Sequence, residues 1–177
     1  MPSIVVQAHR FHYLEHAGEG VPVLLLCSTG LDSRQWNDLL PMLGKRRAIC
    51  LHYLCYPMTD SWSGEEEIDS SLDYDAAEVL LLNQSGAVDI IAHSYGGFIA
   101  LRLAKNHPDR IRRIAVHEPT VWGCLQHTNK DELKNEFGEV VETFFTEGLQ
   151  PEEFLQDFVD YWNDIGTWEL MLSLIHI

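Results

Sequence analysis

The amino-acid sequence predicts an α/β protein with a mostly parallel sheet flanked by helices. Short, continuously apolar runs such as residues 21–27 (VPVLLLC) are typical of strands buried on both faces of a sheet. Between these runs lie segments with apolar residues at every third or fourth position, the spacing of amphipathic helices. Regular alternation of the two patterns is typical of parallel sheets. The 177 residues are enough for one domain with a buried core.

The N-terminal third is expected to supply most of the strands. Two short strands rich in β-branched and aromatic residues come first, and a glycine-containing turn (AGEG) separates them from the first buried strand. A helix with the apolar stripe Trp36, Leu39, Leu40 and Leu43 follows and ends at Gly44. The expected elements are strands at 3–8, 11–15 and 21–27, a helix at 33–43 and a strand at 48–54.

The middle of the chain continues the alternation after a long polar loop. Helical spacing returns at 72–82 and stops at the sequence NQSG, and the next buried strand covers 88–92. A helix at 96–106 ends before Pro108, and 111–117 supplies another strand.

From about residue 129 onward, helical spacing replaces strand runs, and acidic residues dominate. Two amphipathic helices joined through EGLQP fit this part, which we expect to be the start of a helical cap, or lid, with its apolar stripes facing a pocket. A solvated helix face explains the acidic charge. The last six residues, LSLIHI, resemble a translated adapter from sequencing libraries, so we expect the natural protein to continue beyond Met171. The predicted division is 1–122 for the N-terminal part of the core, 123–171 for the start of the cap and 172–177 for the artefact.

Composition limits the classes of partner and compartment. Twenty-seven acidic residues against 12 Lys and Arg give a net charge of −15, which argues against nucleic acid or an anionic membrane as the main partner. No secretory signal is recognisable, the longest apolar run is too short to span a bilayer, and the four cysteines form no CxxC pair. We expect a soluble, cytoplasmic protein. Neither HExxH nor a phosphate-binding GxxxxGK[ST] loop is present, so no metal or cofactor is predicted.

The segment VDIIAHSYGG at 88–97 carries the strongest chemical signal. Ser94 stands between a buried strand and a helix, with the small residues Ala92 and Gly96 two positions to either side. A sharp strand-to-helix turn exposes such a serine, and bulky flanking side chains would clash there. The amides at the start of the following helix favour negative charge on a substrate oxygen. The sequence therefore predicts that Ser94 is a nucleophile.

Residues 21–122 resemble the α/β-hydrolase superfamily. AHSYGGFIALRLAKNHPDRI is similar to its nucleophile turn and following helix, and LLLCSTGLDSRQW is similar to its oxyanion loop. The resemblance implies that the backbone N–H groups of Thr29 and Tyr95 form an oxyanion hole. The family's usual His-Gly pair is replaced here by Cys27 and Ser28, although Trp36 keeps its spacing of nine residues from the first of them. A second departure is HYLCYP at 52–57, where the family usually has Pro-Asp and two glycines.

A serine nucleophile needs a base, and the base needs an orienting acid. In most members of the family the acid follows the cap, but some, such as haloalkane dehalogenases, carry it after the strand that follows the nucleophile's helix. Glu118, 24 residues after Ser94, occupies that alternative position. It is a candidate acid, and the alternative is that it lines the pocket or bonds to a loop.

No histidine after Glu118 is convincing as the base. His127 lies just before the expected cap helices, and His176 belongs to the terminal hexapeptide. The side chain of His93 should point away from Ser94, while His107 and His117 fit a helix end and a strand. We expect the base to lie in a part of the natural protein beyond this chain.

The resemblance implies a hydrolase that acts on an ester or related acyl bond of a small apolar molecule. The same scaffold supports other chemistries, so the fold alone does not choose among them. The chain itself is expected to be inactive because it lacks the base. The alternative function is a catalytically silent, hydrolase-like binding protein, which the altered oxyanion pair favours.

Overall fold

The computed structural model describes residues 1–56, 58–62, 70–144 and 151–170 of the chain. The chain divides into two compact units, Met1–Val121 and Trp122–Ile177. The first unit is the sheet with its helices, and the second is helical. The hexapeptide 172–177 and most of the EGLQP connection lie outside the described residues.

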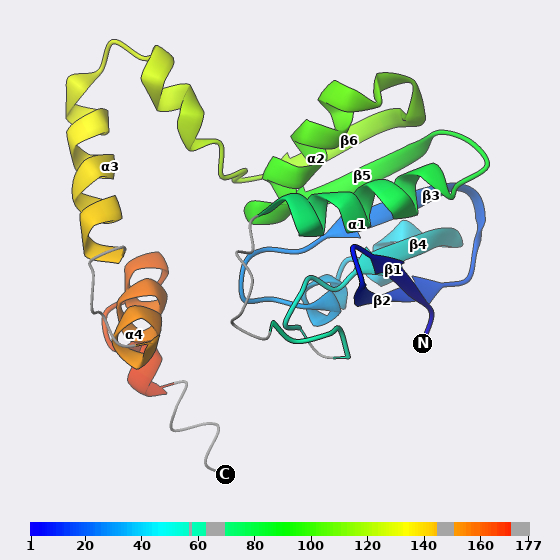
Figure 1. The fold of residues 1–177 in the computed structure, drawn as a ribbon, viewed down its shortest axis with the longest axis horizontal. Helices are drawn as coiled ribbons and strands as arrows, with labels where there is room; N and C mark the ends of the chain where they lie inside the picture. Colours follow the sequence, from blue (N-terminus) through cyan, green and yellow to red (C-terminus); the bar gives the residue numbers. More distant parts are fainter. Residues whose placement is uncertain (57, 63–69, 145–150, 171–177) are drawn as a thin grey trace. The chain divides into compact units, whose positions relative to one another are not determined.

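The first unit is built on a six-stranded mixed sheet with the strand order β1-β2-β4-β3-β5-β6 (Figure 1). The pairs β1/β2 and β2/β4 are antiparallel, while β3 pairs in parallel with both β4 and β5, and β5 with β6. The mostly parallel sheet predicted from the sequence is confirmed. The strands are β1 (Ser3–Val6), β2 (His9–His16), β3 (Glu19–Leu26), β4 (Arg46–Leu51), β5 (Val88–His93) and β6 (Ile111–His117).

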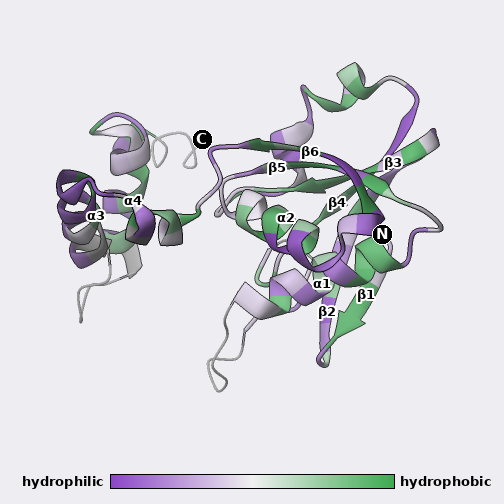
Figure 2. Cartoon of the chain, turned by 90° about the horizontal axis from the view of Figure 1, so that it is seen from above, coloured by the Kyte–Doolittle hydropathy of each residue, from purple (hydrophilic) through white to green (hydrophobic). Residues whose placement is uncertain are grey.

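The three central strands carry the core. Val23–Leu26 of β3 and Ala48–Leu51 of β4 are all buried, as are Val88, Ile90 and Ala92 of β5. Strands between two neighbours in a parallel sheet need apolar residues on both faces, which is why these runs show little alternation. Figure 2 shows these strands as predominantly hydrophobic ribbons.

Helices α1 (Ser70–Leu82) and α2 (Tyr95–Asn106) contact each other and lie on the same face of the sheet (Figures 1 and 2). Polar contacts join the two helices beyond their apolar faces. The guanidinium of Arg102 lies 4.1 Å from the centre of the Tyr74 ring, and His107 Nε2 lies 2.6 Å from Glu78 Oε1. The short 3₁₀ turn η3 (Pro108–Arg110) then leads into β6.

The helix predicted at 33–43 is wrong. The structure has two separate 3₁₀ turns there, η1 (Ser33–Trp36) and η2 (Leu40–Leu43). Pro41 explains the interruption, because it has no N–H to donate to the carbonyl four residues earlier and its ring clashes with that carbonyl. The Asp32 side chain caps η1 by accepting from Arg34 N at 2.9 Å, and Gly44 ends η2 with a positive φ of 63°.

The second unit contains the two helices expected after residue 129. These are α3 (Asp131–Phe144) and α4 (Pro151–Trp162), preceded by the 3₁₀ turn η4 (Trp122–His127). Trp122 stacks on Phe137 with ring centroids 4.7 Å apart, and Phe154 stacks on Phe158 at 5.8 Å. Among the described residues, no helix combines the length and apolar composition needed to cross a membrane.

An ion-pair cluster around the buried carboxylate of Asp89 joins β5, near its amino end, to its neighbour β6 and to β4, two strands away in the sheet. Asp89 is 6% exposed and accepts hydrogen bonds from the guanidinium of Arg112 at 2.6 and 2.8 Å and from that of Arg46 at 2.7 Å. The bonds from Arg112, reinforced by Arg46, hold the pKa of Asp89 below its usual value. Three strands are joined here by one carboxylate, because Arg46 belongs to β4 and Arg112 to β6.

Replacing Asp89 with Asn is expected to lower the free energy of unfolding at pH 7 by about 2 kcal/mol. The loss should stay below that of a fully buried pair because the Arg46 and Arg112 side chains are 33% and 44% exposed and can be rehydrated. The native pKa of Asp89 is lowered, so its contribution is fully present above the unfolded-state pKa of about 4 and is lost as the pH falls through the native pKa. Urea unfolding of the protein and the variant should therefore converge in acid, whereas Asp38→Asn, at an exposed position, should change little at any pH.

Candidate active site

Three of the predicted site residues follow strands that are adjacent in the sheet. Thr29 follows β3, Ser94 follows β5 and Glu118 follows β6, all at the carboxyl ends of parallel strands. The chain passes from β3 to β4 on one side and returns to β5 on the other side of β3. Ligands of open α/β sheets bind at the carboxyl edge where the strand order reverses in this way. The topology therefore brings these residues to the edge where a substrate would bind.

Ser94 occupies a sharp turn between β5 and α2, with φ 50° and ψ −115°. This conformation is unfavourable for a residue with a Cβ and must be held by its surroundings. The turn after β6 holds it on both sides: Ser94 N donates to the carbonyl of His117 at 2.9 Å, and Thr120 N donates to the carbonyl of Ser94 at 3.2 Å. The end of β6 thus fixes the backbone of the predicted nucleophile.

Glycine is required at both positions that follow Tyr95. A Cβ on Gly96 would lie 2.3 Å from the carbonyl oxygen of Leu26 in β3, and one on Gly97 would lie 2.8 Å from the Cβ of Pro119. Gly96 N also donates to the carbonyl of Cys27 at 3.0 Å. Helix α2 therefore begins in direct backbone contact with the end of β3.

The predicted oxyanion loop begins at Cys27, which is buried. Its carbonyl accepts a second hydrogen bond, from the hydroxyl of Tyr53 at 3.1 Å, and its Sγ accepts one from the indole N–H of Trp36 at 3.2 Å. Thr29 is exposed just beyond, and Tyr95 is the first residue of α2. The bond between Gly96 and Cys27 joins the two segments that carry the predicted oxyanion donors.

A cluster of three tyrosines and one aspartate surrounds this junction, and the sequence analysis did not identify it. Asp73 of α1 accepts from the hydroxyl of Tyr95 and from Leu54 N, both at 3.0 Å. The Tyr53 ring meets the Tyr95 ring edge to face at 5.2 Å, and the Tyr56 hydroxyl accepts from Gly30 N. Burial raises the pKa of Asp73 in spite of its two donors. The one signal in the sequence was Tyr53, which stands where the family usually has Asp.

His93, His117 and Glu118 form a second cluster at the ends of β5 and β6. One ligand atom of each lies within 4.8 Å of the other two, so these are the described residues that could hold a metal ion. His93 is already engaged, because its Nδ1 lies 2.9 Å from Gln35 Nε2. Burial and the neighbouring His117 lower the pKa of His93, and Glu118 offsets part of that effect. Glu118 itself has a positive φ of 45° and an exposed side chain.

The candidate bases are dispersed. His107 ends α2 and contacts Glu78, His127 ends η4 in the second unit, and His176 lies outside the described residues. In the described part of the chain, the Ser94 hydroxyl makes no hydrogen bond to a histidine. The structure therefore gives Ser94 a defined backbone position without a base beside its hydroxyl.

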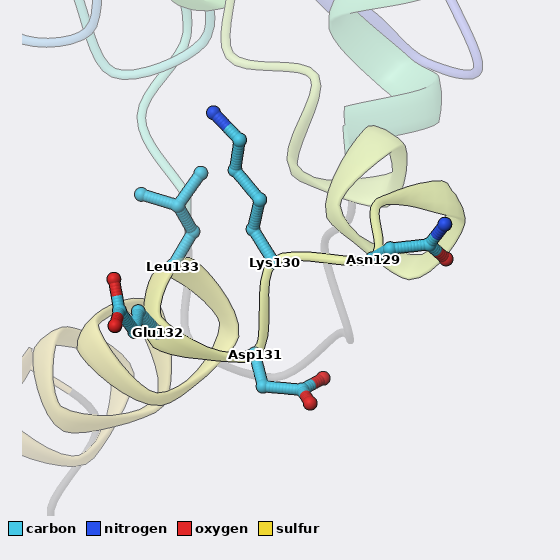
Figure 3. Close-up of a pocket in the computed structure, with 5 residues that line it drawn as sticks. All are labelled: Asn129, Lys130, Asp131, Glu132 and Leu133. Carbon is cyan, nitrogen blue, oxygen red and sulfur yellow. The ribbon is translucent and has the colours of Figure 1, made fainter.

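A hollow of about 540 Å³ lies elsewhere, at the start of α3 (Figure 3). Five consecutive residues, 129–133, line it, and none of them is a predicted site residue. The carboxylates of Asp131 and Glu132 point away from the amine of Lys130 in the close-up, so the polar groups do not converge on one point. This hollow lacks the convergent polar groups of a binding site.

Residues 22–163 match the model of the alpha/beta hydrolase fold family. The chain belongs to this family.

Relatives with assigned activities are hydrolases. The chain is 28% identical over 111 residues to a 2-hydroxymuconate semialdehyde hydrolase from Pseudomonas sp. (strain CF600), a match that covers 58% of this chain and 38% of that protein. It is 26% identical over 129 residues to a haloalkane dehalogenase from Agrobacterium fabrum (strain C58), covering 72% of this chain and 40% of that protein. The chain therefore spans about two fifths of the length of these curated relatives.

Solved structures confirm the fold. The haloalkane dehalogenase DatA from Agrobacterium tumefaciens C58 superposes with a TM-score of 0.63 at 20% identity, covering 94% of this chain and 55% of that one. A variant of an epoxide hydrolase from Bacillus megaterium gives a TM-score of 0.67 at 18% identity, covering 97% and 59%. The comparisons support a hydrolase in general.

Replacing Gly96 with Ala is expected to lower the free energy of unfolding by about 3 kcal/mol, because the new Cβ meets backbone atoms of β3 that cannot rotate away. The matched control is Gly86→Ala, where a Cβ has no neighbour within 4 Å and a small change is expected. Urea unfolding followed by far-UV circular dichroism measures both. Equal stability of the two variants would contradict the close contact between α2 and β3.

Proposed function

We propose that this chain is the nucleophile-bearing part of a serine hydrolase that cleaves an ester or related acyl bond in a small apolar substrate. The observation that supports this most directly is the backbone of Ser94, held at φ 50° and ψ −115° at the carboxyl end of β5. A residue with a Cβ persists in such a conformation only where its surroundings impose it, and strain of this kind clusters at active sites.

In the proposed reaction, Ser94 Oγ attacks the acyl carbon while a base removes the hydroxyl proton. The carbonyl oxygen becomes an oxyanion, and the N–H groups of Thr29 and Tyr95 are the donors that stabilise it. The proton then passes to the departing alcohol, whose bond to the acyl carbon breaks. In the second half of the reaction the base removes a proton from water, the water oxygen attacks the acyl carbon, the same donors hold the oxyanion, and the bond to Ser94 Oγ breaks as Oγ takes up the proton.

Glu118 is the proposed acid that orients the base. Its backbone lies in the turn after β6 that holds Ser94 through His117 and Thr120. The base itself is proposed to be a histidine beyond the 177 residues, because no described histidine is hydrogen-bonded to the serine hydroxyl. The described chain alone is therefore expected to turn over little substrate.

Net charge and the state of the cysteines support the partners and the compartment that we propose for the enzyme. A net charge of −15 disfavours nucleic acid, and the small-molecule substrate we propose fits the family. All four cysteines are free, which fits the reducing cytoplasm that we propose as its compartment. The helices after residue 122 are proposed to begin a lid.

The second candidate is a catalytically silent binding protein of the same fold. The observation that favours it is the replacement of the usual His-Gly pair by Cys27 and Ser28. The Cys27 side chain is buried against Trp36 and Cys50, so it offers no polar group to a substrate.

A fluorophosphonate probe distinguishes these candidates, because it labels only an activated serine. We expect slow labelling of the chain in plain buffer. Free imidazole should raise the labelling rate about tenfold, a small part of the effect of a positioned base. Mass spectrometry of the labelled peptide should locate the adduct on Ser94.

Ser94→Ala should abolish the imidazole-dependent labelling, while Ser85→Ala, in an exposed turn, should leave it unchanged. Rapid labelling without imidazole would show that a base is present in the chain. Labelling that imidazole does not accelerate, or that survives Ser94→Ala, would favour the silent binding protein.

A further inference from the structure

The carboxamide of Gln35 lies between the two halves of the proposed oxyanion hole. Its Oε1 accepts a hydrogen bond from Ser28 N at 3.0 Å, in the residue before Thr29. Its Nε2 lies 2.9 Å from Nδ1 of His93, in the residue before Ser94. One side chain thus connects the oxyanion loop directly to the nucleophile turn.

The backbone around Gln35 is fixed on both sides, so its side chain has a defined origin. Asp32 caps the first residues of η1, and Gln35 N donates to the Asp32 carbonyl at 3.0 Å. The next residue, Trp36, is 7% exposed and donates from its indole to Cys27 Sγ. The 3₁₀ turn is therefore anchored to the same loop that the Gln35 amide holds.

We propose that Gln35 is a positioning residue that sets the separation of the Thr29 and Tyr95 amides by linking Ser28 to His93. This role rests on the proposed function, because it matters only if those amides receive an oxyanion. Other described contacts between the loop after β3 and the turn after β5 are the Gly96–Cys27 bond and the tyrosine cluster, and neither reaches Ser28 N or the ring of His93.

The link also determines which ring nitrogen of neutral His93 carries the proton. A backbone N–H can only donate, so the amide must turn its oxygen to Ser28 and its NH₂ group to His93. Nδ1 of His93 must then accept, which places the ring proton of the neutral imidazole on Nε2. Protonation at Nδ1 would set two donors against each other. The Nδ1 lone pair of His93 is thereby occupied by the Gln35 amide and Nε2 carries the proton, which makes the neutral ring a part of the scaffold and a poor base for Ser94.

The chemistry of the link requires an amide. Glutamate has the same length and would still accept from Ser28, but it would face Nδ1 of His93 with a carboxylate and favour the protonated ring. Methionine has a similar length and would offer His93 no donor and Ser28 only a weak acceptor. The two substitutions therefore separate the electrostatic consequence of the link from its geometric one.

The experiment uses ¹⁵N-labelled protein and long-range ¹H–¹⁵N spectra of the histidine rings between pH 5 and 9. In the unmodified chain, His93 should show the Nε2–H form above its pKa. Gln35→Glu should raise the pKa of His93 by about one unit, because a carboxylate then faces the ring. Gln35→Met should speed hydrogen exchange at the Ser28 amide about fivefold, the effect of one lost hydrogen bond.

Gln156→Glu is the matched control, since it makes the same chemical change at an exposed position of α4. It should leave both readouts unchanged. An Nδ1–H form of His93 in the unmodified protein, or a pKa that Gln35→Glu does not raise, would overturn the proposal. Neither readout depends on turnover. If both behave as expected while Ser94 resists labelling with imidazole present, the link stands and the proposed function fails.

Discussion

Helix α2 begins against the end of β3 with no space for a side chain between the two backbones. A Cβ on Gly96 would lie 2.3 Å from the Leu26 carbonyl oxygen, and Gly96 N donates to the Cys27 carbonyl. The contact brings the amino end of helix α2 to the carboxyl end of a central strand. Ser94 precedes that helix and Thr29 follows that strand, so their relative position depends on this approach.

The proposed oxyanion loop departs from the family pattern and is still held by hydrogen bonds to neighbouring segments. Ser28 stands where the family usually has Gly, and two residues later Gly30 has a left-handed backbone conformation, with φ 76°. The Cys27 carbonyl accepts from both Gly96 and Tyr53. Side chains from η1 and from the segment after β4 therefore hold a loop that has less backbone freedom than the usual one. Cys27 and Ser28 in the loop and Tyr53 after β4, which all depart from the family pattern, therefore belong to one connected set of contacts.

Apolar runs and β-branched composition were sufficient to predict every described strand of the sheet, and helical periodicity was sufficient to predict the helices α1 to α4. Helical periodicity failed at 33–43, where the stripe marked the packed side, with Trp36 buried and Leu39, Leu40 and Leu43 partly buried, but Pro41 broke the hydrogen-bond ladder. The turn at Ser94 was predictable because the small residues it requires, Ala92 and Gly96, lie only two positions away in the sequence. Two sets of hydrogen bonds were not predictable from the sequence, because each joins segments that only the folded topology brings together. These are the bond of Asp73 with Tyr95 and the bonds of Gln35 with Ser28 and His93.

The neighbouring turns after β5 and β6 each contain a residue in an unfavourable backbone conformation. Ser94 and Glu118 both have positive φ, a conformation that costs of order 1–3 kcal/mol for such residues. They lie at the ends of paired parallel strands, and hydrogen bonds run in both directions between their turns, from Ser94 N to His117 and from Thr120 N to Ser94. The backbone position of the serine is therefore a property of the β5–β6 pair.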